Sequence, residues 1–472
     1  MKTRSTALLC AFALVLAACG SRLSDDDLAS GAGTGGGPAV TTPAGTGSSG
    51  AGITEGPDDS GPKVGTLPVP CGEAEGGGAP AAPTGGDPGV SADAIKIAVI
   101  SDRAAVVKVP TASIEESMQA FVDFCNGFGG INGRKLELLK IDSKLFSHLE
   151  ATKEACDAGV FAIVGSGSVT DNQGAQQMVD CDLIEVPAYT VTAAKGLSDR
   201  LVAPLPNPTD FYNVGPARFM KEEHPDAVKK AAIIHGKIDA VDVQARRVKK
   251  AYEAQGFTFV YDKQTEVVQE NYVAEAKAMK DAGVEYFTMV SSTQETVKML
   301  HDMKTQGFEP EVLDLGQQFY DPEMLAEPGA EGAYVLLNTV PFEEKADSKA
   351  LQAYLAAYDA VDSKGKPEPT SLGVQAFSAG LLFATATKAV GDDLTRANVL
   401  AELKKVKKWD GGGLHFVSNP GDNHVATCFM YARIVKGEWV RYHPKKATTW
   451  TCDEDYAFDL QDDYGGGAKA GN

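Results

Sequence analysis

Two short polar stretches carry the side chains best suited to binding a small molecule. Ser166 to Asp171 and Tyr189 to Ala194 each follow an apolar run and supply hydroxyl groups. Each stretch begins a predicted helix, and the first backbone N–H groups of a helix have no partner within it. Such groups favour an anion such as a carboxylate, while helix capping is the alternative role for the hydroxyls. The candidates are Ser166, Ser168, Thr170, Tyr189, Thr190 and Thr192.

Further candidates follow two other predicted strands. Asp102 comes after IKIAVI (95–100), where it would hold a charged ligand group or form a solvated salt bridge beside Arg103. Gln317, Gln318 and Tyr320 come after EVLDLG (311–316). Tyr320 would stack on a ligand, as would Phe319, although aromatic residues after a strand more often belong to the core.

No enzyme motif accompanies these residues. The sequence lacks G-x-S-x-G and H-E-x-x-H, and its 7 histidines are not spaced as metal ligands. It has no C-x-x-C pair, and the acidic stretch DEDYAFDLQDD (453–463) lacks the spaced glycine of a calcium loop. We therefore expect binding without catalysis, and neither a cofactor nor a metal.

The charge of the chain argues against a nucleic-acid partner. Its formal net charge is -20, whereas nucleic-acid binders gather lysine and arginine on one face. A hydrophobic content of 43% is enough for a sizeable core.

The N-terminus reads as an export signal. Residues 1–18 combine Lys2 and Arg4 with an apolar run too short to span a bilayer. Leu16-Ala17-Ala18-Cys19 resembles the bacterial lipobox, in which the cysteine is acylated; an ordinary signal peptide with a chance cysteine is the alternative. The resemblance implies lipidation at Cys19 and an extracytoplasmic protein anchored to the membrane of the bacterial cell envelope.

Residues 19–90 are rich in glycine, serine and proline. Segments such as GAGTGGG (31–37) lack the apolar side chains that offset chain entropy on folding, so we predict a disordered tether. A phosphate-binding loop is the alternative for GAGTGGG, but no strand precedes it and no helix follows.

The cysteine count favours disulfides. Of 8 cysteines, 6 are left once Cys10 is removed and Cys19 is lipidated, an even number that suits an exported protein. Cys156 and Cys181 flank one βαβ step, and Cys428 and Cys452 flank an apparent hairpin. We pair each couple, which leaves Cys71 with Cys125, although six cysteines permit about fifteen connectivities.

After Ser91, short apolar strands alternate with amphipathic helices, a pattern typical of parallel βαβ units. The series restarts near residue 231, so two similar series follow one another. Helices are then expected near 348–361 and 373–390, before an antiparallel end. The predicted strands are 95–100, 135–141, 161–166, 184–189, 231–236, 257–262, 286–292, 311–316 and 333–340.

Several segments together resemble a known family. These are GGINGRKLELLKIDS (129–143), FAIVGSGSVTDNQGAQQ (161–177), VPAYTVTAA (186–194), PTDFYNVGPA (208–217) and GGGLHFVSNPGDNHVATCFMYARIVKGEWV (411–440). Their order and spacing resemble the Leu/Ile/Val-binding family of periplasmic solute-binding proteins over residues 93–445. The resemblance implies the α/β class of the type I periplasmic binding protein: two Rossmann-like lobes with mostly parallel sheets, joined by a three-strand hinge, with ligand in the cleft.

The resemblance also implies domain bounds. Lobe 1 would comprise 91–210 and 341–410, and lobe 2 would comprise 211–340 and 411–455. The acidic, glycine-rich residues 456–472 would form a flexible tail.

By this resemblance the protein would capture a small-molecule ligand by closure of the lobes and deliver it to the permease of an ABC importer. We expect a monomer that contacts the membrane through its lipid anchor. A ligand-sensing receptor or interaction protein without transport is the alternative; a hydrolase would need a nucleophile and a base that the sequence does not provide.

The sequence departs from the family at the ligand-contacting positions. Val169 stands where amino-acid-binding members have a hydroxyl, Ala194 replaces a threonine, and HGKIDAVD (235–242) lacks the usual tyrosine-glycine. Near Gln317 and Gln318 an acidic residue is missing, and a neutral amide does not compensate a buried ammonium. The predicted ligand is a small polar solute, either an amino acid or an amide-like compound, with a larger molecule as the alternative.

Overall fold

The computed structural model describes residues 61–73, 86–104, 111–462 and 464–465. Every described residue belongs to one unit, Ser49–Asn472. The predicted signal peptide and Cys19 lie outside the described residues. Among the helices that the structure describes, none is both long and apolar enough to cross a membrane.

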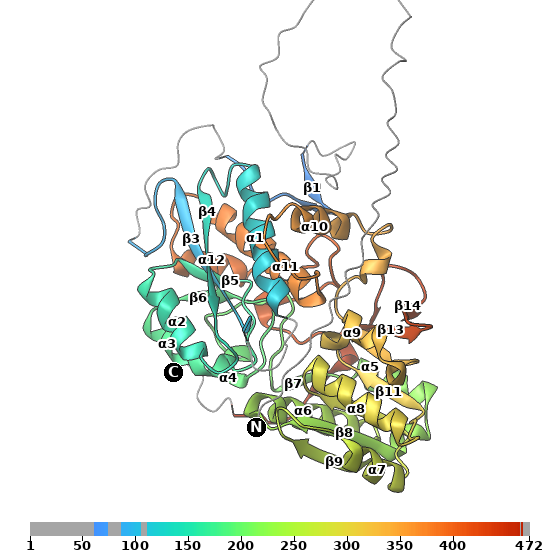
Figure 1. The fold of residues 1–472 in the computed structure, drawn as a ribbon. Helices are drawn as coiled ribbons and strands as arrows, with labels where there is room; N and C mark the ends of the chain where they lie inside the picture. The colour runs from blue at the N-terminus through green and yellow to red at the C-terminus, as the bar shows by residue number, and fades with distance from the viewer. Residues whose placement is uncertain (1–60, 74–85, 105–110, 463, 466–472) are drawn as a thin grey trace, which may run out of the picture. The chain divides into compact units, whose positions relative to one another are not determined.

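Lobe 1 is built on a parallel sheet of 4 strands (Figure 1). Its order is β4-β3-β5-β6, with Ile97 of the central strand opposite Leu138 on one side and Ala162 on the other. Both faces are covered, which explains the nearly continuous apolar runs. The strands are β3 (Ala94–Ser101), β4 (Lys135–Asp142), β5 (Ala162–Val164) and β6 (Ile184–Val186).

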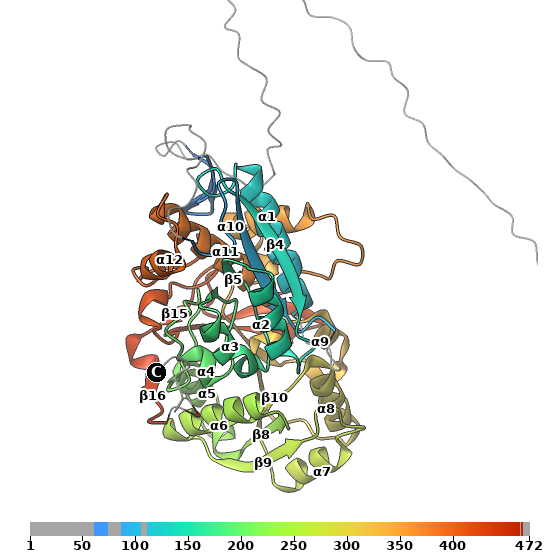
Figure 2. The same ribbon diagram turned by 90° about the vertical axis from the view of Figure 1, so that its left-hand side faces the viewer.

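Helices pack on both faces of this sheet. Side chains of β3 that alternate along the strand separate two cores: Ile97 packs with α1 and α11, and Ala98 with α2 and α3. Figures 1 and 2 show these two pairs of helices on opposite sides of the strands. The helices of lobe 1 are α1 (Ala112–Gly127), α2 (His148–Asp157), α3 (Ala175–Asp180), α4 (Ala193–Gly196), α10 (Lys349–Asp359), α11 (Ser371–Val390) and α12 (Arg396–Leu403).

Lobe 2 has a larger sheet of 8 strands. Its order is β14-β13-β12-β11-β10-β8-β9, with β15 paired to β13. Strands β8 to β12 are parallel, while β13 pairs antiparallel with β12, β14 and β15, as predicted for the C-terminal region. The strands are β8 (Ala231–Gly236), β9 (Phe259–Thr265), β10 (Tyr286–Val290), β11 (Val312–Leu315), β12 (Tyr334–Leu337), β13 (Cys428–Val435), β14 (Glu438–His443) and β15 (Thr451–Cys452).

The two faces of the lobe 2 sheet carry different helices. One core lies between the sheet and α7 and α8, and the other lies between the sheet and α5 and α6. The helices of lobe 2 are α5 (Gly215–Glu223), α6 (Asp239–Ala254), α7 (Val273–Asp281), α8 (Thr293–Thr305) and α9 (Pro322–Ala326).

The chain passes between the lobes three times: between β6 and β7 (Phe211–Asn213), between β12 and α10, and between α12 and β13. Thr339 and His415 form an isolated antiparallel bridge between the second and third passages. Leu414 packs in the core of lobe 1, so the third passage begins after the predicted bound of 411. The α/β class with two lobes and mostly parallel sheets is confirmed.

Two segments predicted to be flexible are folded where the structure describes them. Within the predicted tether, β1 (Lys63–Val64) pairs with β2 (Leu67–Pro68), and Val64 is fully buried in the core of lobe 1. Within the predicted tail, β16 (Ala457–Asp459) pairs with β7, and Leu460 is fully buried in lobe 2. A few well-placed apolar side chains thus dock segments whose overall composition indicates disorder.

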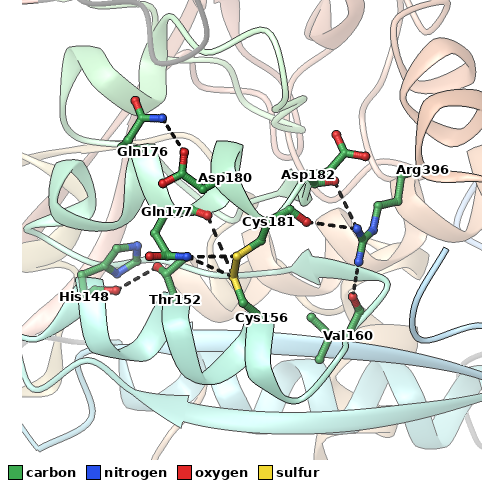
Figure 3. The surroundings of a disulfide bond; sticks show 10 residues. All are labelled: His148, Thr152, Cys156, Val160, Gln176, Gln177, Asp180, Cys181, Asp182 and Arg396. Carbon is green, nitrogen blue, oxygen red and sulfur yellow. Dashed lines mark hydrogen bonds between the residues drawn. A yellow bond between two sulfur atoms is a disulfide. The ribbon is translucent and has the colours of Figure 1, made fainter.

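All three predicted disulfides are present: Cys71–Cys125, Cys156–Cys181 and Cys428–Cys452. Figure 3 shows the second, which joins the end of α2 to the residue after α3. Beside it, the Arg396 side chain donates hydrogen bonds to the carbonyl oxygens of Val160 (2.7 Å) and Cys181 (3.2 Å) (Figure 3). This bond network fastens α12 to the loops of lobe 1.

Candidate ligand-binding site

A cavity of about 400 Å³ lies at the carboxyl ends of strands from both lobes. Its lobe 1 wall includes Val169 after β5 and Tyr189 to Val191 after β6. Its lobe 2 wall includes Ser291 to Thr293 after β10 and Gly316 to Gln318 after β11. This is the edge at which open α/β sheets bind ligands.

Four of the predicted site residues line this cavity: Tyr189, Thr190, Gln317 and Gln318. The ring of Tyr189 lies against Gly167, where a Cβ atom would be only 2.2 Å from the ring, so the glycine makes room for it. Burial and the charges of Asp102 and Asp171 raise the pKa of Tyr189 well above its ordinary value. Its hydroxyl group is therefore neutral at physiological pH.

A hydrogen bond joins the two walls of the cavity. The Gln375 side chain, on α11 of lobe 1, donates from Nε2 to Oε1 of Gln317 at 2.8 Å. Both residues line the cavity. Gln375 was not predicted from the sequence, although a glutamine within the apolar helix SLGVQAFSAG (371–380) was a signal.

The remaining six predicted residues do not line the cavity. Two of them, Asp102 and Ser168, bond to each other inside lobe 1. The Asp102 carboxylate accepts hydrogen bonds from Ser143 Oγ (2.6 Å), Ser168 Oγ (2.9 Å) and the Val169 backbone N–H (2.8 Å). Asp102 is 1% exposed and thus joins the loops after β3, β4 and β5. Arg103, next to it, forms an ion pair with Glu115.

Asp171 has a similar role at the next loop. Its carboxylate accepts from the backbone N–H groups of Val191 (2.8 Å) and Thr192 (3.1 Å) and from the Thr192 hydroxyl. Burial raises the pKa of Asp171 to about 7, against the lowering effect of these bonds. The N–H groups expected to hold an anionic ligand group are therefore already occupied by carboxyl groups of the protein.

The other hydroxyl candidates also bond within the protein. The Thr170 hydroxyl donates to the carbonyl oxygen of Leu145, and the Ser166 hydroxyl donates to the Glu185 carboxylate. Tyr320 packs against Phe342 and Trp439 in the lobe 2 core, with ring centroids 5.8 and 5.0 Å away. A direct ligand contact by these residues stays a prediction.

On the lobe 2 side, the cavity also contains two charged residues that the sequence did not reveal. Asp314, in β11, is 5% exposed and accepts a hydrogen bond from the Tyr286 hydroxyl. Burial raises the pKa of Asp314 to about 6, although the hydroxyl groups of Tyr286 and Tyr431 lower it. A carboxylate in the apolar strand VLDL was a signal that could have identified it.

Arg247, in α6, is fully buried. It donates from Nη1 to Gln244 (2.9 Å) and from Nη2 to the carbonyl oxygens of Pro208 and Phe211 (both 2.8 Å). Its Nε has no hydrogen-bond partner among the described residues. Nothing in an amphipathic helix with paired arginines distinguishes this one from a surface residue.

Comparison with known proteins identifies a family and a fold. A sequence model of the family described as periplasmic binding protein matches residues 94–438. A search of curated protein sequences found no match.

Solved structures with a similar fold include three binding proteins. The fatty acid ABC transporter substrate-binding protein of Thermomonospora curvata has a TM-score of 0.64 and 18% identity, over 82% of this chain and 96% of that one. A solute-binding protein of R. palustris in complex with benzoate has a TM-score of 0.61 and 15% identity, over 76% and 98%. The branched-chain amino acid transporter substrate-binding protein of Streptococcus pneumoniae, in complex with isoleucine, has a TM-score of 0.60 and 18% identity, over 74% of this chain and 100% of that one.

Proposed function

Because the chain belongs to the periplasmic binding protein family, we propose that it captures a small solute between its two lobes and delivers it to the permease of an ABC importer. The family consists of solute-binding proteins, so the chain is not an enzyme. The observation that carries the proposal is the cavity itself, whose walls come from the strand ends of both lobes. Closure of such lobes shields a ligand from water.

The location follows in part from the family, whose members act outside the cytoplasm. We propose further that acylation of Cys19 anchors the protein to the membrane, on the basis of the sequence Leu16-Ala17-Ala18-Cys19. Replacing Cys19 by alanine should then move the protein from the membrane fraction to the soluble fraction. Retention of the variant in membranes would refute the anchor.

The ligand was predicted to be an amino acid or an amide-like solute. Amide side chains of Asn207, Gln317 and Gln318 line the cavity, which supports a hydrogen-bonding solute. Occupation of the lobe 1 N–H groups by Asp102 and Asp171 weighs against a free amino acid held by its carboxylate.

A ligand screen tests the proposed function. Purified protein is heated with single solutes from a panel that includes amino acids, amides, alcohols, benzoate and fatty acids. A solute that binds the native state raises the unfolding midpoint as its concentration increases. At a hundred times its Kd, it adds about 2.7 kcal/mol to the free energy of unfolding. Crosslinking to a co-expressed permease then distinguishes delivery from sensing. A panel without any midpoint shift contradicts solute capture.

A further inference from the structure

The cavity continues from the cleft into lobe 2 along one face of α6. Its lining includes Val241, Gln244, Val248 and Tyr252, which are spaced by three, four and four residues. Residues at this spacing share one face of a helix. From Val241 to Tyr252 the helix rises about 16 Å at about 1.5 Å per residue. The lined surface is therefore long and extends well beyond the mouth of the cleft.

The opposite wall is the sheet. Thr288 and Val290 of β10, Asp314 of β11 and Leu336 of β12 line the cavity. In the same strands, Tyr286, Val312 and Tyr334 pack in the core beneath α5 and α6. Each is an even number of residues before the lining residues of its strand. Because side chains alternate along a strand, the lining residues point to the same face of the sheet. The cavity thus runs between α6 and the sheet, inside lobe 2.

Most of this channel is apolar, but it holds two charged groups with incomplete bonding. Asp314 has no salt-bridge partner among the described residues, and the groups that stabilise its charge are two neutral hydroxyl groups, those of Tyr286 and Tyr431. Both terminal nitrogens of Arg247 donate to the protein, whereas Nε is a nitrogen without a hydrogen-bond partner among the described residues. A buried carboxylate without a cation is costly, and a ligand that donates to it removes that cost.

Lobe 1, in contrast, offers no obvious place for a carboxylate. The Val169 N–H donates to Asp102, and the Val191 and Thr192 N–H groups donate to Asp171. A ligand carboxylate in the cavity would find these N–H groups already bonded and would face the carboxylate of Asp314. Like charges in a buried site repel each other strongly.

We propose that the ligand is an elongated, mainly apolar molecule that extends along α6 into lobe 2 and presents a hydroxyl or amine donor to Asp314. This inference rests on the proposed function, because it names the class of solute that the cavity captures. The apolar lining favours an alkyl chain or aromatic rings, and Arg247 Nε suits a neutral oxygen acceptor on the same molecule.

Three probes of equal chain length test the inference by calorimetry: 8-aminooctan-1-ol, 1,8-octanediol and octanoate. The amine and the diol should bind, and octanoate should bind at least about tenfold more weakly because its charge is repelled. Asp314→Asn should weaken 8-aminooctan-1-ol by at least about tenfold, because the ion pair is lost. The diol should lose less, because an amide oxygen still accepts from a hydroxyl group.

A pair of variants on α6 tests the position of the channel. Val241 lines the cavity, whereas Val243, on the same helix, does not. Val241→Phe should narrow the channel and raise the Kd of the diol by at least about tenfold, while Val243→Phe should leave it within about twofold. Circular dichroism and the unfolding midpoint confirm that both variants fold.

The outcomes separate this inference from the proposed function. Tighter binding of octanoate than of 8-aminooctan-1-ol, or equal diol binding by the two valine variants, overturns the inference. The three probes can fail to bind while another solute binds, with an affinity that Val241→Phe does not change. That result would support solute capture and would refute the proposed channel along α6. If no solute binds at all, both fall.

Discussion

Each lobe buries a carboxylate within a strand of its sheet, but the two carboxylates have different partners. Glu185 in β6 of lobe 1 is 3% exposed, forms an ion pair with the buried Lys195 and accepts from Ser166. Asp314 in β11 of lobe 2 is 5% exposed and accepts from Tyr286, with no cation beside it among the described residues. Glu185 is thus paired with a cation inside lobe 1, whereas Asp314 in lobe 2 is a buried carboxylate that a ligand can satisfy.

This difference indicates how the lobes divide their roles. In lobe 1, Asp102 and Asp171 join neighbouring loops and fix the shape of the cavity wall. In lobe 2, α6 and the sheet enclose the longer part of the cavity, and Asp314 lies within it. We infer that lobe 1 is a preorganised frame and that lobe 2 supplies most of the specificity.

The largest effect is expected from removing the cation of lobe 1. Lys195→Met leaves Glu185 buried and unpaired, so the free energy of unfolding should fall by about 3–5 kcal/mol. Urea unfolding at pH 7 measures the change. The double variant Lys195→Met/Glu185→Gln removes both charges and should recover most of the loss. If the double variant is as unstable as the single one, the ion pair does not explain the effect.

The corresponding change in lobe 2 should have the opposite sign. Because burial raises the pKa of Asp314 to about 6, the native state binds its proton more tightly than the unfolded state does. The free energy of unfolding therefore falls as pH rises from about 4 to about 6, by about 3 kcal/mol in total. Asp314→Asn removes this penalty, so it should match the wild type near pH 4 and be more stable by about that amount at pH 8.

Urea unfolding of both proteins across this pH range checks the expectation. Asp281→Asn is the matched control, because Asp281 is exposed and pairs only with Lys277 on its own helix among the described residues. It should change stability by less than about 1 kcal/mol at either pH. Lower stability of Asp314→Asn at pH 8 would mean that Asp314 is satisfied within the protein and is not held ready for a ligand.

The comparison also shows where sequence reasoning succeeds. Alternating apolar strands and amphipathic helices predicted the α/β class, because a parallel sheet buried on both faces leaves a strong local pattern. The disulfides were predicted because Cys156 and Cys181 flank one structural step, as do Cys428 and Cys452. Gln317 and Gln318, named as candidates from the family resemblance, line the cavity, while their contact with a ligand stays a prediction.

The sequence could not show which hydroxyl groups are free. Ser168 and Thr192 have the residue type and position of ligand contacts, but Asp102 and Asp171 lie close to them only in the folded lobe. Similarly, the burial of Arg247 depends on carbonyl oxygens of residues 208 and 211, which approach it through tertiary structure. Local pattern gives the place of the site, whereas three-dimensional contacts decide which polar groups are available.

A smaller loss is expected when the frame of lobe 1 is weakened at Asp171. Asp171→Asn leaves one oxygen to serve donors from Val191 and Thr192, and the new amide group faces one of those donors. The free energy of unfolding should fall by about 1–3 kcal/mol, opposite in sign to the change at Asp314. Asp157→Asn, on an exposed position of α2, is the control. A gain in stability at pH 7 would contradict the assigned role, since the variant would then lose nothing when one of the two accepting oxygens is replaced.

The smallest effect concerns the bond between the lobes. Gln375→Ala removes the donor to Gln317 Oε1, a neutral hydrogen bond worth about 0.5–1.5 kcal/mol. The Kd of any captured solute should rise by about twofold to tenfold, because the closed form loses this contact. X-ray scattering of the ligand-free variant should show a larger radius of gyration.

The control is Gln176→Ala, because Gln176 bonds to Asp180 within lobe 1 at 2.8 Å. This variant should change neither the Kd nor the radius of gyration. Equal affinities and equal scattering for Gln375→Ala and the wild type would mean that this hydrogen bond does not stabilise the closed form.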